Sequence, residues 1–347
     1  VLANTGRTSE ALSATQTAVN LSPLDPAGHN NLGINLLELG RLEESEVSLR
    51  KAIEYKPDLS DAHNALGNTL KEMKKFDDAE ASYKKSIEYN SDNVFAHTNL
   101  GIMLLELNRL EEAEELLRKA IKLNPGNSKA KHMLSSLLGE TTEYAPYDHV
   151  EDLFDGFAAK FDNLLSVDLE YRTPNLIADI IKKDSKFDSL GSVMDLGCGT
   201  GLLGLEIKKY CKYLEGIDLS QKMLLQAKNK NIYNKLVKQD ILDYLSNENL
   251  DFDYFIATDV FVYLGNLSDI FRLIKSRNKR SGKFVFSTEH NNGENFFLEK
   301  SGRYSHSKNY IESLCDKFEY KLNIFKLNNL RKERNDYIKG GLYLLEF

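Results

Sequence analysis

The hydrophobic and polar positions of the first 140 residues repeat with a fixed spacing. Glycine, leucine and histidine columns recur every 34 residues at Gly33, Gly67, Gly101, Leu32, Leu66, Leu100, His29, His63 and His97. Within each unit, apolar residues follow i, i+3 or i+4, i+7 spacing, which predicts two amphipathic helices. Pro57 and Pro125 mark turns into the next unit. We therefore expect one truncated unit, three full units and a capping helix over residues 1–140.

This periodic array resembles the tetratricopeptide repeat, which implies an all-α solenoid with a concave face. Asparagines recur on the first helix of the units, at Asn30, Asn31, Asn64 and Asn99. Because an asparagine amide offers both a donor and an acceptor, such a ladder can pair with the backbone of an extended chain. The pattern predicts a groove for an unknown protein or peptide, and the alternative is a polar solvated face. Successive histidines are too far apart to share a metal ion, so we expect an aromatic packing column and no metal site.

The periodicity stops near residue 141, and strand-like and helix-like segments then alternate. Five strand candidates are followed by two long ones at the end of the chain: 191–196, 213–218, 235–240, 252–258, 282–289, 320–329 and 340–347. This order is typical of a parallel sheet with helices on both faces. We predict a Rossmann-like, seven-stranded α/β domain over residues 141–347, in which the last two strands form an antiparallel hairpin.

A glycine-rich segment follows the first predicted strand, and two nucleotide-binding signatures overlap in it. "GTGLLG" from Gly199 fits dinucleotide binders, whereas "DLGCGTG" from Asp195 fits the turn of S-adenosylmethionine enzymes. In an open α/β sheet the ligand binds at the carboxyl ends of the strands. NAD requires a helix N-terminus for its pyrophosphate. A carboxylate at Asp195 favours a cationic sulfonium compound with an amino-acid end.

Acidic residues also follow the second and third predicted strands. Asp218 suits ribose hydroxyls, and Asp240 can accept a hydrogen bond from an adenine amino group, while Met223 and Ile241 could contact the ring. The alternative for Asp195 and Asp218 is a helix cap, for Asp240 a surface turn residue and for Met223 plain core packing. The full set of expected cofactor-binding residues is Tyr171, Arg172, Asp195, Gly197, Cys198, Gly199, Gly201, Asp218, Leu219, Met223, Gln239, Asp240, Ile241, Thr258 and Asp259.

Together with "TDVFVYLGNL" and "SGRYSHSKNYIESL", these motifs resemble predicted class I methyltransferases that carry tetratricopeptide repeats. That group is akin to the biotin-synthesis and ubiquinone-type small-molecule methyltransferases. The resemblance implies S-adenosylmethionine as methyl donor and S-adenosylhomocysteine as product. It also implies a helical lid over residues 148–185, in which Arg172 could bind the methionine carboxylate. A surface ion pair is the alternative for Arg172.

The acceptor is less well defined by the sequence. We expect a small molecule or a carrier-bound metabolite, with His290, His306 or Tyr263 as candidate catalytic residues. The segment "TDVFVY" lacks the Asn/Asp-Pro-Pro-aromatic motif, which disfavours methylation of exocyclic base or glutamine amides. Two alternatives are a protein substrate captured by the repeat groove, and a repeat scaffold whose methyltransferase fold only senses the cofactor.

Composition limits the remaining classes of partner. The chain has 347 residues and a net charge of −7, which argues against a dedicated nucleic-acid binder. No apolar run approaches a membrane span, so we expect no membrane partner. Three cysteines without metal-type spacing indicate reduced thiols and a cytoplasmic protein. Because Val1 falls within a repeat, we expect further sequence before it, and targeting cannot be judged.

Overall fold

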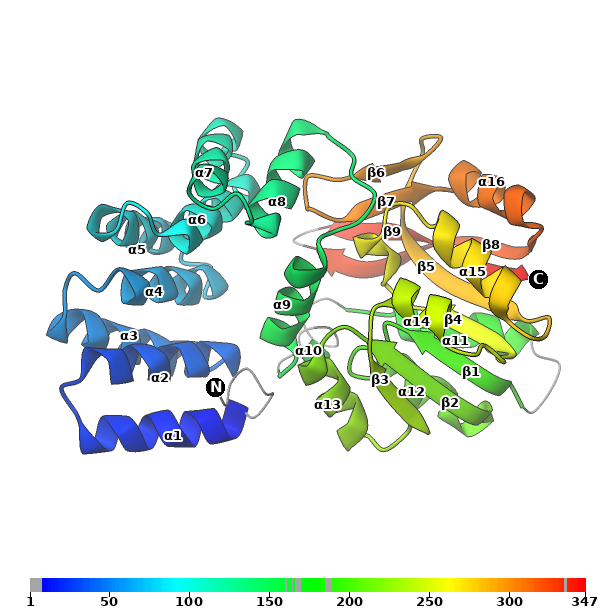
Figure 1. The fold of residues 1–347 in the computed structure, drawn as a ribbon, viewed down its shortest axis with the longest axis horizontal. Coiled ribbons are helices and arrows are strands. Elements are labelled where there is room, and N and C mark those ends of the chain that lie inside the picture. Colours follow the sequence, from blue (N-terminus) through cyan, green and yellow to red (C-terminus); the bar gives the residue numbers. More distant parts are fainter. Residues whose placement is uncertain (1–7, 160, 164, 166–169, 185–188, 334–335) are drawn as a thin grey trace. The chain divides into compact units, whose positions relative to one another are not determined.

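The computed structural model describes residues 8–159, 161–163, 165, 170–184, 189–333 and 336–347. The chain separates into two compact units, residues 1–140 and residues 141–347 (Figure 1). Each unit has its own hydrophobic clusters, and each is described by itself.

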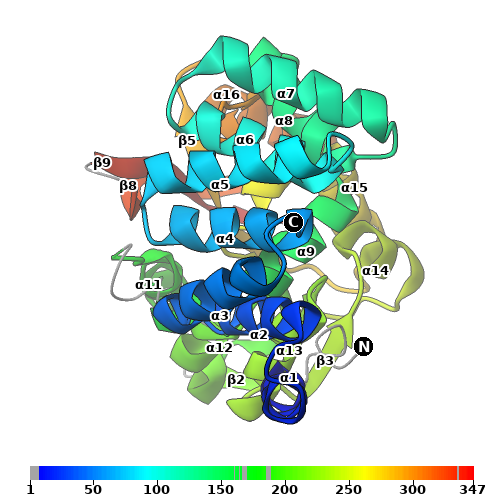
Figure 2. The ribbon, with the colours of Figure 1, turned by 90° about the vertical axis from the view of Figure 1, so that its left-hand side faces the viewer.

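The described part of the first unit consists of helices joined by short turns. They are α1 (Thr8–Leu21), α2 (Pro26–Glu38), α3 (Leu42–Tyr55), α4 (Ser60–Glu72), α5 (Phe76–Tyr89), α6 (Val94–Glu106), α7 (Leu110–Leu123) and α8 (Ser128–Leu138). Figure 2 shows the helix pairs stacked one above another. Gly67 allows close packing within a pair, because a Cβ there would lie 2.6 Å from the ring of Tyr83. The predicted all-α solenoid is confirmed.

The histidine column has a structural role. His63 Nε2 lies 2.8 Å from the carbonyl oxygen of Pro57, and its ring packs against Tyr89 with centroids 5.3 Å apart. His29 makes the equivalent contact with the carbonyl of Pro23, also at 2.8 Å. Each histidine therefore ties the first helix of a repeat to the turn that closes the preceding one.

The second unit is built on a mixed sheet of β1 (Gly191–Leu196), β2 (Cys211–Asp218), β3 (Lys235–Lys238), β4 (Tyr254–Ala257), β5 (Lys283–Asn291), β6 (Phe296–Leu298), β7 (Tyr304–Ser307), β8 (Lys321–Glu333) and β9 (Asp336–Glu346). The strand order is β3-β2-β1-β4-β5-β7-β6, and β9 pairs antiparallel with both β5 and β8. All seven predicted strands are present. The expectation of seven is corrected to nine over the described residues, because β6 and β7 form a short hairpin inserted after β5.

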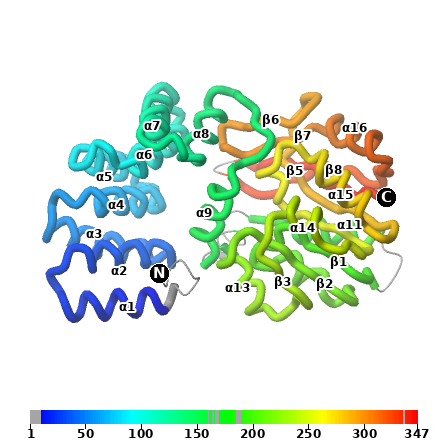
Figure 3. The backbone as a smooth tube through the Cα atoms, in the orientation of Figure 1, coloured from blue at the N-terminus to red at the C-terminus, as the bar shows by residue number. Residues whose placement is uncertain are grey.

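Helices cover both faces of this sheet. They are α11 (Thr173–Asp184), α12 (Leu202–Ile207), α13 (Gln221–Asn229), α14 (Ile241–Asn247), α15 (Ser268–Arg277) and α16 (Lys308–Phe318), with short 3-10 turns η3 (Lys208–Tyr210) and η4 (Phe261–Tyr263). Residues of α14, α15 and α16 share one core cluster with the sheet, and residues of α11 and α12 share another. The parallel order of β1 to β4, followed in Figure 3, brings the carboxyl ends of these strands to one edge.

The segment predicted as a lid, residues 148–185, divides into helices with different roles. It includes most of α9 (Tyr147–Phe157), α10 (Phe161–Asn163) and α11, while residues 160, 164, 166–169 and 185 lie outside the described part of the chain. Ile177 and Ile181 on α11 are fully buried in the core of the sheet. The lid prediction is therefore corrected for α11, which is a covering helix of the sheet.

Among the described residues, no helix is both long enough and apolar enough to cross a bilayer.

Candidate functional site

The glycine-rich segment forms a tight turn between β1 and α12. Gly197, Gly199 and Gly201 have φ of +67°, +53° and +87°, a region that side-chain-bearing residues rarely adopt. A Cβ at Gly197 would also lie 2.5 Å from Val260 Cγ2. The turn therefore depends on glycine both for its backbone conformation and for the close approach of the loop after β4.

Two buried carboxyl groups lie beside this turn, at the tips of β1 and β2. Asp195 is 1% exposed and accepts a hydrogen bond of 2.6 Å from the Tyr233 hydroxyl. Asp218 accepts hydrogen bonds of 2.8 Å from the backbone N–H groups of Gly199 and Ser220. Burial raises the pKa of Asp195 to about 7 and that of Asp218 to about 6. Burial disfavours the ionised form of both groups. A ligand that places a positive charge or a hydroxyl donor beside them would stabilise that ionised form.

The tip of β3 has a different local structure. Asp240 is the N-cap of α14, where its side chain accepts from the backbone N–H groups of Leu242 and Asp243. A helix cap was the alternative interpretation for Asp195 and Asp218, but it is Asp240 that caps a helix. Asp240 still faces the cavity, next to Gln239 and Ile241.

A cavity of about 620 Å³ lies along the carboxyl ends of these strands. Its wall brings together most of the residues predicted from the sequence. These are Tyr171, Asp195, Gly197, Cys198, Gly199, Asp218, Leu219, Gln239, Asp240, Ile241, Thr258, Asp259 and Tyr263. The hydroxyl of Thr258 is buried without a hydrogen-bond partner in the described part of the chain, so a polar ligand group can satisfy it.

Three predicted cofactor residues lie outside this wall. The side chain of Arg172 is 70% exposed, and its Nη2 lies 3.9 Å from Glu170 Oε2. The prediction that it binds the cofactor is therefore corrected, and the alternative of a surface ion pair applies. Met223 on α13 is fully buried. It is a core residue, which was the alternative interpretation for this position. Gly201 supports the site indirectly, because it is the N-cap residue of α12.

The two histidines proposed as bases are also corrected. His306 on β7 is fully buried, and its Nε2 lies 2.9 Å from the carbonyl oxygen of Gly265. Burial lowers the pKa of His306 to about 4. His290 packs beside Phe325, and burial lowers its pKa as well. Neither histidine belongs to the described cavity wall, whereas Tyr263 does.

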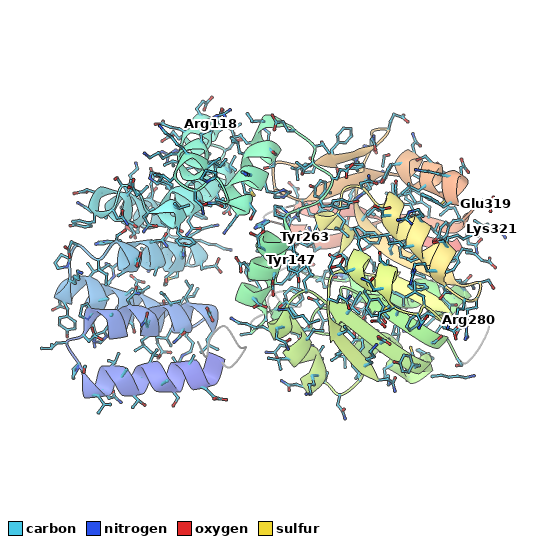
Figure 4. The ribbon with its side chains drawn as sticks, viewed as in Figure 1. Arg118, Tyr147, Tyr263, Arg280, Glu319 and Lys321 are labelled. Carbon is cyan, nitrogen blue, oxygen red and sulfur yellow. The ribbon has the colours of Figure 1, made fainter. Side chains whose placement is uncertain are left out.

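Helix α9 contributes to the cavity wall and is fixed near the ends of β2 and β3 by two polar contacts. Ser220 Oγ donates to Asp155, and Lys238 Nζ lies 2.7 Å from Glu151. Tyr147 and Phe154 of α9 line the cavity, and Phe154 packs edge-to-face against Tyr263 at 5.3 Å. Tyr147 and Tyr263, both labelled in Figure 4, line the same cavity.

Helix α10 covers the glycine turn in a similar way. Asp162 accepts from Thr200 Oγ1, and it forms an ion pair of 2.6 Å with Lys230. Lys230 also donates to the Thr200 carbonyl at 2.7 Å. The acidic residues of α9 and α10 are visible in the sequence. Their partners are distant in the chain, so the contacts could not be predicted from a local pattern.

A polar cluster at the other end of the cavity includes Asp259, which was expected at the cofactor, and Arg331, which was not predicted. Arg331 on β8 is 7% exposed and contacts both Asp259 and Glu289. Arg303, which precedes β7, contacts Glu289 and Glu333. Both arginines line the cavity.

Models of protein families match both units. Residues 27–59 and 64–128 match tetratricopeptide repeats, and residues 187–339 match a methyltransferase domain. The chain carries tetratricopeptide repeats and a methyltransferase domain.

Solved structures similar to the methyltransferase domain include three enzymes with low sequence identity. Magnesium protoporphyrin IX methyltransferase from Synechocystis PCC 6803, with bound SAM, is 18% identical, with a TM-score of 0.40, over 50% of this chain and 78% of that one. An S-adenosylmethionine-dependent methyltransferase from Clostridium acetobutylicum ATCC 824 is 20% identical, with a TM-score of 0.42, over 56% and 99%. A SAM-dependent methyltransferase from Leishmania major is 14% identical, with a TM-score of 0.44, over 57% and 82%. No curated protein matches the chain.

The methyl donor of this methyltransferase domain is S-adenosylmethionine. The residues of the cavity wall fit this compound. Asp195 and Asp218 are buried acceptors that suit an ammonium group and ribose hydroxyls. Leu219 and Ile241 are apolar residues of the same wall, a chemistry that fits a purine, and Asp240 also lines it.

Proposed function

We propose that this protein transfers a methyl group from S-adenosylmethionine to a small molecule or a carrier-bound metabolite. The observation that supports the proposal is the placement of Asp195, Asp218 and Asp240 on one cavity wall, at the tips of the adjacent strands β1, β2 and β3. Asp195 would hold the amino-acid end of the donor, Asp218 its ribose and Asp240 its adenine.

The residues of this chain contribute alignment and exclusion of water. S-adenosylmethionine, when bound, supplies a methyl group that is already activated for displacement. The glycine turn fixes the position of the donor, and α9 and α10 close over it through Asp155, Glu151 and Asp162. Such positioning and desolvation account for a large share of the rate in reactions of this type.

The repeats would recruit a protein partner. Asn99 Nδ2 donates to Asn64 Oδ1 at 3.2 Å, so two of the predicted ladder residues are linked directly across the first helices of adjacent repeats. Asn31 is exposed, whereas Asn30 is buried and belongs to the packing between helices. A peptide backbone could pair with Asn31, Asn64 and Asn99, and this prediction is separate from the methyl transfer itself.

Two measurements test the proposal. Calorimetry should show binding of S-adenosylmethionine and S-adenosylhomocysteine but not of NADH, and the opposite result would refute it. Incubation with methyl-labelled donor and a fractionated cell extract should then label small molecules or carrier-bound metabolites. Label in ordinary polypeptides would favour the alternative of a protein substrate captured by the repeats.

The groove is tested independently by changing Asn31, Asn64 and Asn99 together to alanine. We expect the triple variant to lose partner capture while it keeps donor affinity. If an identified partner binds the triple variant as tightly as the wild type, the repeats use another surface.

A further inference from the structure

Arg303 and Arg331 face the end of the cavity that lies away from the donor residues. The sheet order places Asp240, Asp218 and Asp195 at the tips of β3, β2 and β1 in turn. On the opposite side of β4, strand β5 pairs with both β7 and β9, and β9 pairs with β8. Arg303 and Arg331 come from this second side, so their guanidinium groups belong to the acceptor half of the cavity.

Each guanidinium is held by carboxylates, and of these Asp259 also lines the cavity. Arg331 donates to Glu289, and its Nη1 lies 3.5 Å from Asp259 Oδ2. Arg303 donates to Glu333, and its Nε lies 3.1 Å from Glu289 Oε1. Glu289 and Glu333 are not among the described lining residues. They therefore fix the orientation of the two cations without covering the side that faces the cavity.

These contacts leave hydrogen-bond donors unused. An arginine carries five N–H donors in a planar fork, and the pairs above engage only part of them. Arg303 Nε is buried without a correctly aligned acceptor within the described structure, despite its short distance to Glu289. A buried donor without an acceptor is costly, so the arrangement favours a ligand that accepts hydrogen bonds.

The other polar groups near Arg303 and Arg331 also favour a ligand that accepts hydrogen bonds. Tyr171 and Tyr263 line the cavity as neutral phenols, since burial raises the pKa of both hydroxyls. The carboxylate of Asp259 is already engaged by Ser287 Oγ at 2.9 Å and by Arg331. A cationic acceptor would face two guanidinium groups and, among the described residues at this end, a single carboxylate, Asp259, that Arg331 already engages, and a purely apolar acceptor would leave the guanidinium donors unpaired.

We propose that the methyl acceptor carries a carboxylate, and that Arg303 and Arg331 bind it. The inference rests on the proposed function, because it assigns the acceptor half of the same cavity. Glu289 shows that a single carboxylate can reach both guanidinium groups. The apolar side chains of Phe154 and Leu165 give the rest of the acceptor a hydrophobic surface.

The experiment uses the full chain saturated with S-adenosylhomocysteine. Thermal melting is recorded with two pairs of probes, octanoate against octanamide and phenylacetate against phenylacetamide. The two members of each pair share their apolar body and differ in the head group, which is an anionic acceptor in the acid and a neutral amide with N–H donors in the control. At about ten times its Kd, at least one carboxylate should raise the melting temperature by roughly 3–6 °C, and its amide should not.

Variants of Arg303 identify the residue responsible, because its side chain is 23% exposed and its replacement is tolerable for folding. Arg303→Gln should abolish the carboxylate-dependent shift. Arg303→Lys should retain part of it, since lysine keeps the charge but loses the planar fork. Arg280→Gln is the matched control, because Arg280 pairs with Asp251 and Asp253 at the amino-terminal edge of the sheet, far from Tyr263 in Figure 4.

Three outcomes would overturn the inference. They are equal shifts from every amide and its carboxylate, no shift from any carboxylate, and an Arg303→Gln variant that weakens S-adenosylhomocysteine binding itself. The third would assign the guanidinium to the donor. The affinity of the wild type for S-adenosylhomocysteine is measured first. If the wild type does not bind this compound, the result counts against the proposed function and not against the carboxylate site.

Discussion

Replacement of Asp195 by asparagine should make the unliganded methyltransferase domain more stable at neutral pH. The carboxyl is 1% exposed, and burial raises its pKa from 3.8 to about 7. A carboxyl with a raised folded-state pKa contributes its stability below pH 3.8, and this contribution is lost as the pH rises through about 7. Between pH 5 and pH 8 the ionisation of Asp195 should therefore cost about 3 kcal/mol, at 1.36 kcal/mol for each pH unit below the folded pKa.

The Asp195→Asn variant should escape this cost. Asparagine keeps one oxygen to accept the Tyr233 hydrogen bond, and it does not ionise. We expect the stability advantage of the variant over the wild type to grow by about 3 kcal/mol between pH 5 and pH 8. Native-state hydrogen exchange of the β1 amides measures this difference locally, without a contribution from the repeats.

The control is Tyr233→Phe, which removes a hydrogen bond that lowers the pKa of Asp195. It should move the pH-dependent loss of stability to higher pH. If wild type and Asp195→Asn differ by the same amount at pH 5 and pH 8, the carboxyl is not held in a desolvated site. The burial argument would then be refuted.

Three further changes test the remaining elements. Gly197→Ala should cost roughly 1–3 kcal/mol in thermal unfolding, since alanine is strained at φ +67° and meets Val260, and calorimetry should show weaker S-adenosylhomocysteine binding. His63→Ala should destabilise the repeats by about 1–3 kcal/mol and leave donor affinity unchanged, because the Pro57 carbonyl loses its partner. Arg172→Ala should change S-adenosylhomocysteine affinity by less than about twofold, as expected for an exposed side chain, and a tenfold loss would show that it reaches the donor.

Much of the fold could be predicted because its elements are periodic or strongly apolar. The 34-residue period defines the repeats, and β1 ends in an acidic residue and a glycine turn that are adjacent in the chain. The hairpin β6–β7 could not be predicted in this way. Its strands have three and four residues, and β7 consists of Tyr304, Ser305, His306 and Ser307.

The missed hairpin explains the error at His306. In the sequence it looks like an exposed loop histidine, whereas in the structure it lies in a buried strand. Arg331 was missed for a similar reason, since the predicted strand ended at residue 329 and β8 continues to Glu333. Its partners Asp259 and Glu289 are 72 and 42 residues away, so no local pattern indicates the cluster.

The residues that follow the last repeat complete the wall of the cavity. The hydroxyls of Thr142 and Tyr304 hydrogen-bond at 2.5 Å, Ala145 N donates to the Tyr263 carbonyl at 3.0 Å, and Tyr144 and Ala145 line the cavity. A fragment that starts at the first helix of this unit, α9, would lack these contacts and leave the cavity open beside Tyr263. A fragment that keeps the cavity wall should therefore begin at or before Thr141, although residues 141–146 form no named helix or strand and lie outside the family match.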